Sequence, residues 1–90
     1  MKGRASVPQI SIKLFASLNR FLPEGAERNE AAFECADGDT VQSVLDRLNV
    51  PRENCHLVVV NGVFIPPDQR TAKTLAGGDA LAVWPPVAGG

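Results

Sequence analysis

The chain has 90 residues, of which 44% are apolar and 21% are charged, and its formal net charge at pH 7 is −1. These values fit one small soluble domain, and the near-zero charge lacks the clustered basic excess of a nucleic-acid-binding surface. No apolar run approaches the roughly 20 residues that span a bilayer, and the start of the chain lacks the apolar stretch of a signal peptide. Two cysteines are too few for a secreted disulfide scaffold, so we expect a cytoplasmic protein without membrane or nucleic-acid partners.

The first part of the chain predicts two strands joined by a polar connection. Residues 1–8 show no periodicity and are expected to form a flexible N-terminal lead-in. Alternating apolar residues predict one strand over 9–15 and a second over about 31–36. Between them, residues 17–30 are polar, with a short helical turn expected at the front of the connection.

The middle of the chain carries the clearest helix signal. An apolar stripe at helical spacing consists of Val41, Val44, Leu45 and Leu48. Asp39 is placed to cap the N-terminus of this helix, and Gln42 completes a pair that resembles a capping box. The helix is predicted to run to about Asn49, because Pro51 cannot continue it.

The last third of the chain predicts three further strands. Residues 57–60 are rich in valine, Asn61-Gly62 suits a type I′ turn, and residues 63–65 form the returning arm of the hairpin. A final strand is predicted over 80–84. One helix cannot cover both faces of a mixed sheet of this size, so the expected fold is a two-layer α+β roll of about five strands with the helix on one face. This domain is expected to span 9–84.

The chain ends in a tail whose composition suggests a chemical role for its terminus. The tail residues are Pro85, Pro86, Val87, Ala88, Gly89 and Gly90. The two prolines stiffen its root, so the tail is expected to extend away from the domain by up to roughly 20 Å. The two glycines lack a Cβ and could enter a narrow slot, and the Gly90 carboxylate is ionised at neutral pH. Such a tail suits delivery of a carboxylate into another protein's active site.

Five segments together give the chain a resemblance to a known family. They are IKLFA at 12–16, DGDTV at 37–41, VVNG at 59–62, LAGGD at 75–79 and PPVAGG at 85–90. With the predicted order of strands and helix, they resemble the ubiquitin-like sulfur carriers of the β-grasp fold, typified by the small subunit of molybdopterin synthase and the thiamine-pathway sulfur carrier. The resemblance covers residues 9–90, and the form of the tail is closer to the molybdopterin branch.

The resemblance implies a carrier protein rather than an enzyme, with no catalytic side chain, bound cofactor or metal of its own. An E1-like enzyme would use ATP to adenylate the Gly90 carboxylate, and a persulfide donor would convert the acyl-adenylate to a thiocarboxylate. The carrier would then insert its tail into the large subunit of a synthase, or into another acceptor enzyme, and give up the sulfur. Gly89 would allow the close approach, and the tail residues 85–88 would be recognised by these partners. Molybdenum or tungsten cofactor biosynthesis is the first expectation.

Three other kinds of function are compatible with the sequence, two that need activation of Gly90 and one that does not. Similar carriers serve cysteine biosynthesis, thiamine biosynthesis and tRNA thiolation. A ubiquitin-like modifier would instead join Gly90 to a lysine of a target protein. A β-grasp interaction module would never be activated, and deletion of the two terminal glycines would leave its function unchanged.

A docking surface is predicted at the root of the tail. If Leu81 and Val83 face the helix-covered core, strand alternation places Trp84 on the opposite face, and the same logic places Phe15 there. In the family's topology the first and last strands are neighbours, so Phe15 and Trp84 are expected to form an exposed apolar patch, with Val59 as a third member. We expect this patch to dock the activating enzyme or the synthase large subunit. The alternative for Trp84 is a core aromatic residue.

The two cysteines are expected to be structural. Cys35 shares a strand face with Phe33 and suits a small buried hydrophobe. Cys55 precedes His56, which invites the interpretation of a nucleophilic pair or a metal site. A metal site needs further ligands at fixed spacing, and a catalytic pair needs an orienting group and a pocket, so neither is expected.

Overall fold

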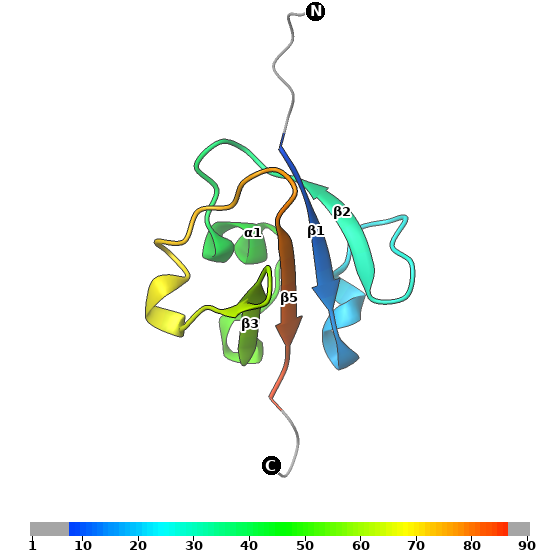
Figure 1. Cartoon of the computed structure of the whole chain (residues 1–90). Coiled ribbons are helices and arrows are strands. Elements are labelled where there is room, and N and C mark those ends of the chain that lie inside the picture. Colours follow the sequence, from blue (N-terminus) through cyan, green and yellow to red (C-terminus); the bar gives the residue numbers. More distant parts are fainter. Residues whose placement is uncertain (1–7, 87–90) are drawn as a thin grey trace, which may run out of the picture.

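A five-stranded mixed sheet carries one α-helix on one of its faces in the computed structural model, which describes residues 8–86 (Figure 1). The strands are β1 (Gln9–Leu14), β2 (Glu30–Glu34), β3 (Leu57–Val60), β4 (Val63–Phe64) and β5 (Ala80–Trp84), and the helix is α1 (Val41–Arg47). Three short 3-10 helices, η1 (Ala16–Phe21), η2 (Arg52–Asn54) and η3 (Pro67–Gln69), lie in the connections. The strand order is β2-β1-β5-β3-β4, and the predicted α+β roll is confirmed. No helix within residues 8–86 is long and apolar enough to cross a membrane.

The first and last strands occupy the centre of the sheet. β1 and β5 pair in parallel, with Ile12 opposite Leu81 and Leu14 opposite Val83, whereas every other neighbouring pair is antiparallel. Because the two central strands are parallel, β1 begins at one end of the molecule and β5 finishes at the other (Figure 1).

One apolar cluster joins the sheet to the helix. Along the strands, alternate side chains are buried, as the period of a strand requires. The fully buried members of the cluster include Ile12, Leu14, Val41, Val44, Leu45, Val58, Leu81 and Val83. The predicted helix stripe and the predicted inward faces of the first and last strands therefore form the core.

The start of the helix differs from the prediction. Thr40, and not Asp39, is the N-cap: its hydroxyl accepts a hydrogen bond from the Ser43 N–H, and the Ser43 hydroxyl in turn accepts from the Thr40 N–H. The Gln42 side chain donates to Asp46 instead of completing a capping box. Asp39 closes the preceding turn, since its carboxylate accepts from the Ala36 N–H at 2.8 Å.

Other element boundaries also shift by one or two residues. The helix ends at Arg47, with Leu48 as its C-cap, and Asn49 adopts a left-handed φ of 67° that ends the helix before the predicted boundary. The second strand begins at Glu30 and ends at Glu34, because the next residues enter the turn that Asp39 closes. The predicted type I′ turn is supported by positive φ values of 51° at Asn61 and 84° at Gly62.

A buried arginine fixes the long connection after the hairpin. Arg70 is 4% exposed, and its guanidinium donates to three main-chain carbonyls, those of Ile65, Cys55 and His56. The Arg70 carbonyl accepts from the Gln42 N–H at 2.9 Å, so the same residue also satisfies a free donor at the N-terminus of α1. Nothing in the hydrophobic pattern of the sequence predicts this role.

We predict that Arg70→Met lowers the free energy of unfolding by about 1–3 kcal/mol, because buried carbonyls lose their donors. Arg52→Met is the matched control: Arg52 pairs with Asp46 at the surface, where side-chain exposures are 66% and 46%, and such pairs contribute about 0–1 kcal/mol. Urea denaturation measures both values. Equal losses for the two variants would contradict the structural role of Arg70.

Two aspartates that close turns predict an acid-sensitive fold. The N–H of Ala36 holds the pKa of Asp39 below its usual value, and the N–H of Ala76 does the same for Asp79. The pKa of an aspartate in the unfolded chain is about 3.9. Because the pKa of each carboxyl is lower in the folded protein, ionisation stabilises the fold above the unfolded pKa, and this stability is lost as the pH falls through the folded pKa. We expect the Asp39→Asn, Asp79→Asn double variant to lose less stability between neutral pH and pH 3 than the wild type, measured by denaturation at each pH. Asp68→Asn, at an exposed position in η3, is the control, and a double variant with the same acid loss as the wild type would refute the assignment.

Candidate functional site

The sheet face opposite α1, which we call the open face, carries an apolar surface at the end of the molecule where β5 finishes. Cross-strand pairing places Leu57 beside Trp84 and Val59 beside both Ala82 and Phe64. We define the apolar surface as Phe15, Leu57, Val59, Phe64, Ala82 and Trp84. The predicted trio of Phe15, Val59 and Trp84 therefore lies on one face, and each of the three is half-buried.

Phe15 and Trp84 are in direct contact. Their ring centroids are 4.5 Å apart and the ring planes differ by 8°, which is a parallel stack. Such aromatic pairs contribute about 0.5–1.5 kcal/mol beyond the area they bury. Trp84 lies on the open face and outside the core cluster, so the alternative of a core aromatic residue is wrong.

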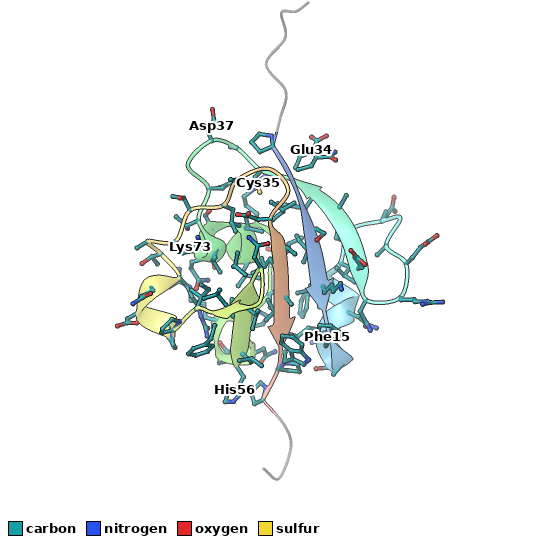
Figure 2. The ribbon with its side chains drawn as sticks, in the orientation of Figure 1. Phe15, Glu34, Cys35, Asp37, His56 and Lys73 are labelled. Atoms are coloured by element: carbon teal, nitrogen blue, oxygen red, sulfur yellow. The ribbon has the colours of Figure 1, made fainter. Side chains whose placement is uncertain are left out.

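The backbone at the root of the tail is held on both sides. The Phe15 N–H donates to the Val83 carbonyl at 3.1 Å, and the His56 N–H donates to the Trp84 carbonyl at 3.0 Å. Figure 2 shows Phe15 and His56 at the end of the molecule where β5 finishes. Pro85 follows directly and lacks an N–H, so regular pairing stops there.

Two residues of the tail, Pro85 and Pro86, belong to the described part of the chain. Pro85 is half-buried and Pro86 is exposed. The remaining residues, Val87, Ala88, Gly89 and Gly90, lie outside the described residues, so their roles in recognition and sulfur attachment stay predictions.

The hairpin of β3 and β4 adds a residue that the sequence reasoning missed. Phe64 is 52% exposed and lies on the open face opposite Val59. Val63 is 62% exposed but pairs with the inward-facing Val60, so it belongs to the other side of the sheet. Continuing the strand alternation through the Asn61-Gly62 turn would have placed Phe64 next to Val59.

Over β1 and β2 the open face is bordered by charged side chains. A groove of about 720 Å³ runs between the open face of β1 and β2 and the loop that precedes β2. Its lining includes Lys13, Phe15, Glu27, Arg28 and Glu30. Two cations and two carboxylates therefore border the apolar surface beside Phe15, which gives the face an apolar part and a part of mixed charge.

Neither cysteine is arranged for chemistry. Cys35 and Cys55 are both buried, and burial raises the pKa of each thiol, which disfavours the reactive thiolate. The Cys55 thiol donates to the Pro51 carbonyl at 3.5 Å, whereas His56 is exposed to solvent. Across residues 8–86, no three His, Cys, Asp or Glu side chains converge on a point that could hold a metal ion.

Comparison with known proteins gives a family and several structural relatives. The sequence pattern of the ThiS family matches residues 12–90. A search of curated proteins found no match. The solution structure of the Haloferax volcanii HVO 2177 protein is similar with a TM-score of 0.71 and 25% identity, over 100% of this chain and 93% of that one.

Two further structures share the fold. SAMP1 of Haloferax volcanii is similar with a TM-score of 0.64 and 25% identity, over 91% of this chain and 99% of that one. A Pyrococcus furiosus protein described as molybdopterin converting factor, subunit 1, has a TM-score of 0.64 and 20% identity, over 89% of this chain and 99% of that one. At 20% identity, the likeness to the Pyrococcus protein supports the β-grasp fold alone.

Proposed function

Because the chain belongs to the ThiS family, we propose that it is a cytoplasmic sulfur carrier whose Gly90 carboxylate is the group that is activated and loaded. The observation that carries this proposal is the family match, which extends through the tail to residue 90. The geometry at the end of β5 supports it, since the strand is paired up to Val83 on the β1 side and up to Trp84 on the β3 side, and two prolines follow at once.

The proposed chemistry takes place on the main chain. A Gly90 carboxylate oxygen attacks the α-phosphorus of ATP, the bond to the bridging oxygen of the β-phosphate breaks, and pyrophosphate leaves. The terminal sulfur of a persulfide then attacks the acyl carbon, and AMP leaves. A thiol attacks the sulfur–sulfur bond of the resulting acyl disulfide, which releases the thiocarboxylate and leaves a new disulfide between the thiol and the donor.

In this proposal the catalytic groups and the sulfur belong to other proteins. An E1-like enzyme binds ATP and catalyses adenylation, and the carrier itself is a substrate without a bound cofactor. Both cysteines of the chain are buried with raised pKa values, so the persulfide is assigned to a separate donor. The loaded carrier then delivers its sulfur to an acceptor enzyme, and the Pro-Pro-Val-x-Gly-Gly tail favours the large subunit of a molybdopterin synthase.

We assign docking to the apolar surface of the open face. Phe15, Val59 and Trp84 keep the role that the sequence predicted for them, and Phe64 extends the surface towards the hairpin. Aromatic residues at the centre of an interface commonly supply most of its binding energy. A partner seated here would contact the chain beside the point where the tail leaves, so docking and delivery of Gly90 would occur together.

A ubiquitin-like modifier is the second candidate function. It shares the activation step and differs only in the final acceptor, which is the amine of a lysine rather than a sulfur-accepting enzyme. Both candidates make the same demand on the tail, because each needs the Gly90 carboxylate to be activated.

Activation is tested by ATP–pyrophosphate exchange with the cognate E1-like enzyme. We expect Gly89→Ala to lower the exchange rate by about tenfold or more, because a Cβ next to the reacting residue blocks close approach. Gly77→Ala is the matched control: a Cβ there meets its nearest atom, the Cα of Pro8, at 3.7 Å, which is ordinary contact. Exchange that persists unchanged after deletion of residues 89–90 would contradict the assignment of activation to Gly90, and an absence of exchange with the wild type would favour a module that is never activated.

Docking is tested by the affinity of the same pair of proteins. We expect Trp84→Ala to weaken binding by about 30-fold, or roughly 2 kcal/mol, as for a central aromatic hot spot. Val63→Ala, which also removes an exposed apolar side chain but on the other side of the sheet, should leave the affinity unchanged. Isothermal titration calorimetry measures both, with circular dichroism to show that each variant is folded. A folded Trp84→Ala variant with wild-type affinity would remove the docking assignment.

A further inference from the structure

The last two residues of β5 are held by hydrogen bonds from both neighbouring strands and by an aromatic stack. The Val83 carbonyl is bonded from the β1 side by the Phe15 N–H, and the Trp84 carbonyl is bonded from the β3 side by the His56 N–H. The Phe15 ring then lies flat on the Trp84 ring at a centroid separation of 4.5 Å. Trp84 is therefore held through its backbone and its side chain at the position that precedes the tail.

Phe15 is itself fixed in place. Its carbonyl accepts a hydrogen bond from the N–H of Leu18 at 3.1 Å, and the Leu18 side chain is fully buried in the core. The next residue, Ala16, has a φ of 54°, in the left-handed region. An alanine is strained in this conformation relative to the right-handed form. This strained turn leads the chain directly from Phe15 into η1, so the Phe15 ring is set by the core and not by a free loop.

The direction of a long tail depends on the orientation of its root. A rotation at Trp84 displaces every residue that follows it in the chain, the reacting Gly90 included. A misplacement of about 1 Å at a reacting centre can cost a hundredfold in rate. Pro85 restricts its own φ, so the orientation of Trp84 determines the direction in which the chain leaves the sheet.

We infer that Phe15 is a positioning residue for the reaction at Gly90: its ring holds Trp84, and Trp84 fixes the direction in which Pro85 and the tail depart. This inference rests on the proposed function, and it gives Phe15 a task separate from docking. A residue that only docks contributes to affinity, whereas a residue that only positions the tail contributes to turnover once the complex has formed.

The kinetic test compares kcat and KM for the carrier in adenylation by the E1-like enzyme. Phe15→Leu, which keeps apolar bulk for docking but removes the stacking ring, should lower kcat about tenfold, and any rise in KM from the docking role of the same side chain should be smaller than this fall in kcat. Phe15→Tyr keeps a ring and should recover most of the lost turnover. The matched control is Phe33→Leu, since Phe33 lies on β2, packs against the core and contacts Arg47, and both its constants should stay at the wild-type values. A loss that falls on KM alone, or an equal loss in Phe15→Tyr and Phe15→Leu, would overturn the positioning role.

A second readout needs no partner, and it separates this inference from the proposed function. Trp84 is the only tryptophan in the sequence, so its fluorescence reports the stack. In Phe15→Leu we expect stronger quenching by acrylamide and about tenfold faster amide hydrogen exchange at His56, whose N–H bonds the Trp84 carbonyl. Phe33→Leu should change neither. If exchange at His56 and quenching of Trp84 stay at wild-type values in a folded Phe15→Leu variant, the positioning role is wrong whether or not Gly90 is adenylated. An absence of adenylation in the wild type would refute the proposed function instead.

Discussion

The parallel pairing of β1 with β5 is the constraint on which the rest of the molecule depends. It brings residues near the two ends of the sequence together at the centre of the sheet, and it buries Leu14 against Val83. Because the pairing is parallel, the end of β1 lies beside the end of β5. Phe15 therefore meets Trp84 at the point where the tail begins. An antiparallel pairing of the same two strands would place the start of β1 there instead, and the stack could not form.

Most of the fold could be predicted from local patterns. Strand alternation in 80–84 placed Leu81 and Val83 inward and Trp84 outward, and the helical stripe placed Val41 and Val44 in the core, as the structure shows. Local patterns do not predict that the first and last strands are neighbours in the sheet. Only the resemblance to the sulfur carriers predicts it, and the expected contact between Phe15 and Trp84 depends on that step.

The features that escaped prediction depend on contacts between segments distant in sequence. Arg70 looks like a solvent-exposed residue in a polar loop, and only the folded chain brings the carbonyls of Cys55 and His56 to its guanidinium. Asp39 and Thr40 are both good capping residues. In the fold, one oxygen of the Asp39 carboxylate accepts from the Ala36 N–H in the preceding turn, and the Thr40 hydroxyl is the group that accepts from a helix N–H. These side chains form hydrogen bonds with polar backbone groups, so the spacing of apolar residues along the sequence does not predict their roles.

The central claim is that Gly90 carries sulfur, and mass spectrometry of the C-terminal peptide tests it most directly. The protein is isolated from its own cells, in the absence of added thiols, and digested. We predict a peptide that ends at Gly90 and in which one carboxylate oxygen is replaced by sulfur. A C-terminal peptide that contains only the carboxylate, together with the same peptide joined through Gly90 by an isopeptide bond to lysines of other proteins, would contradict the sulfur-carrier function and identify the chain as a modifier.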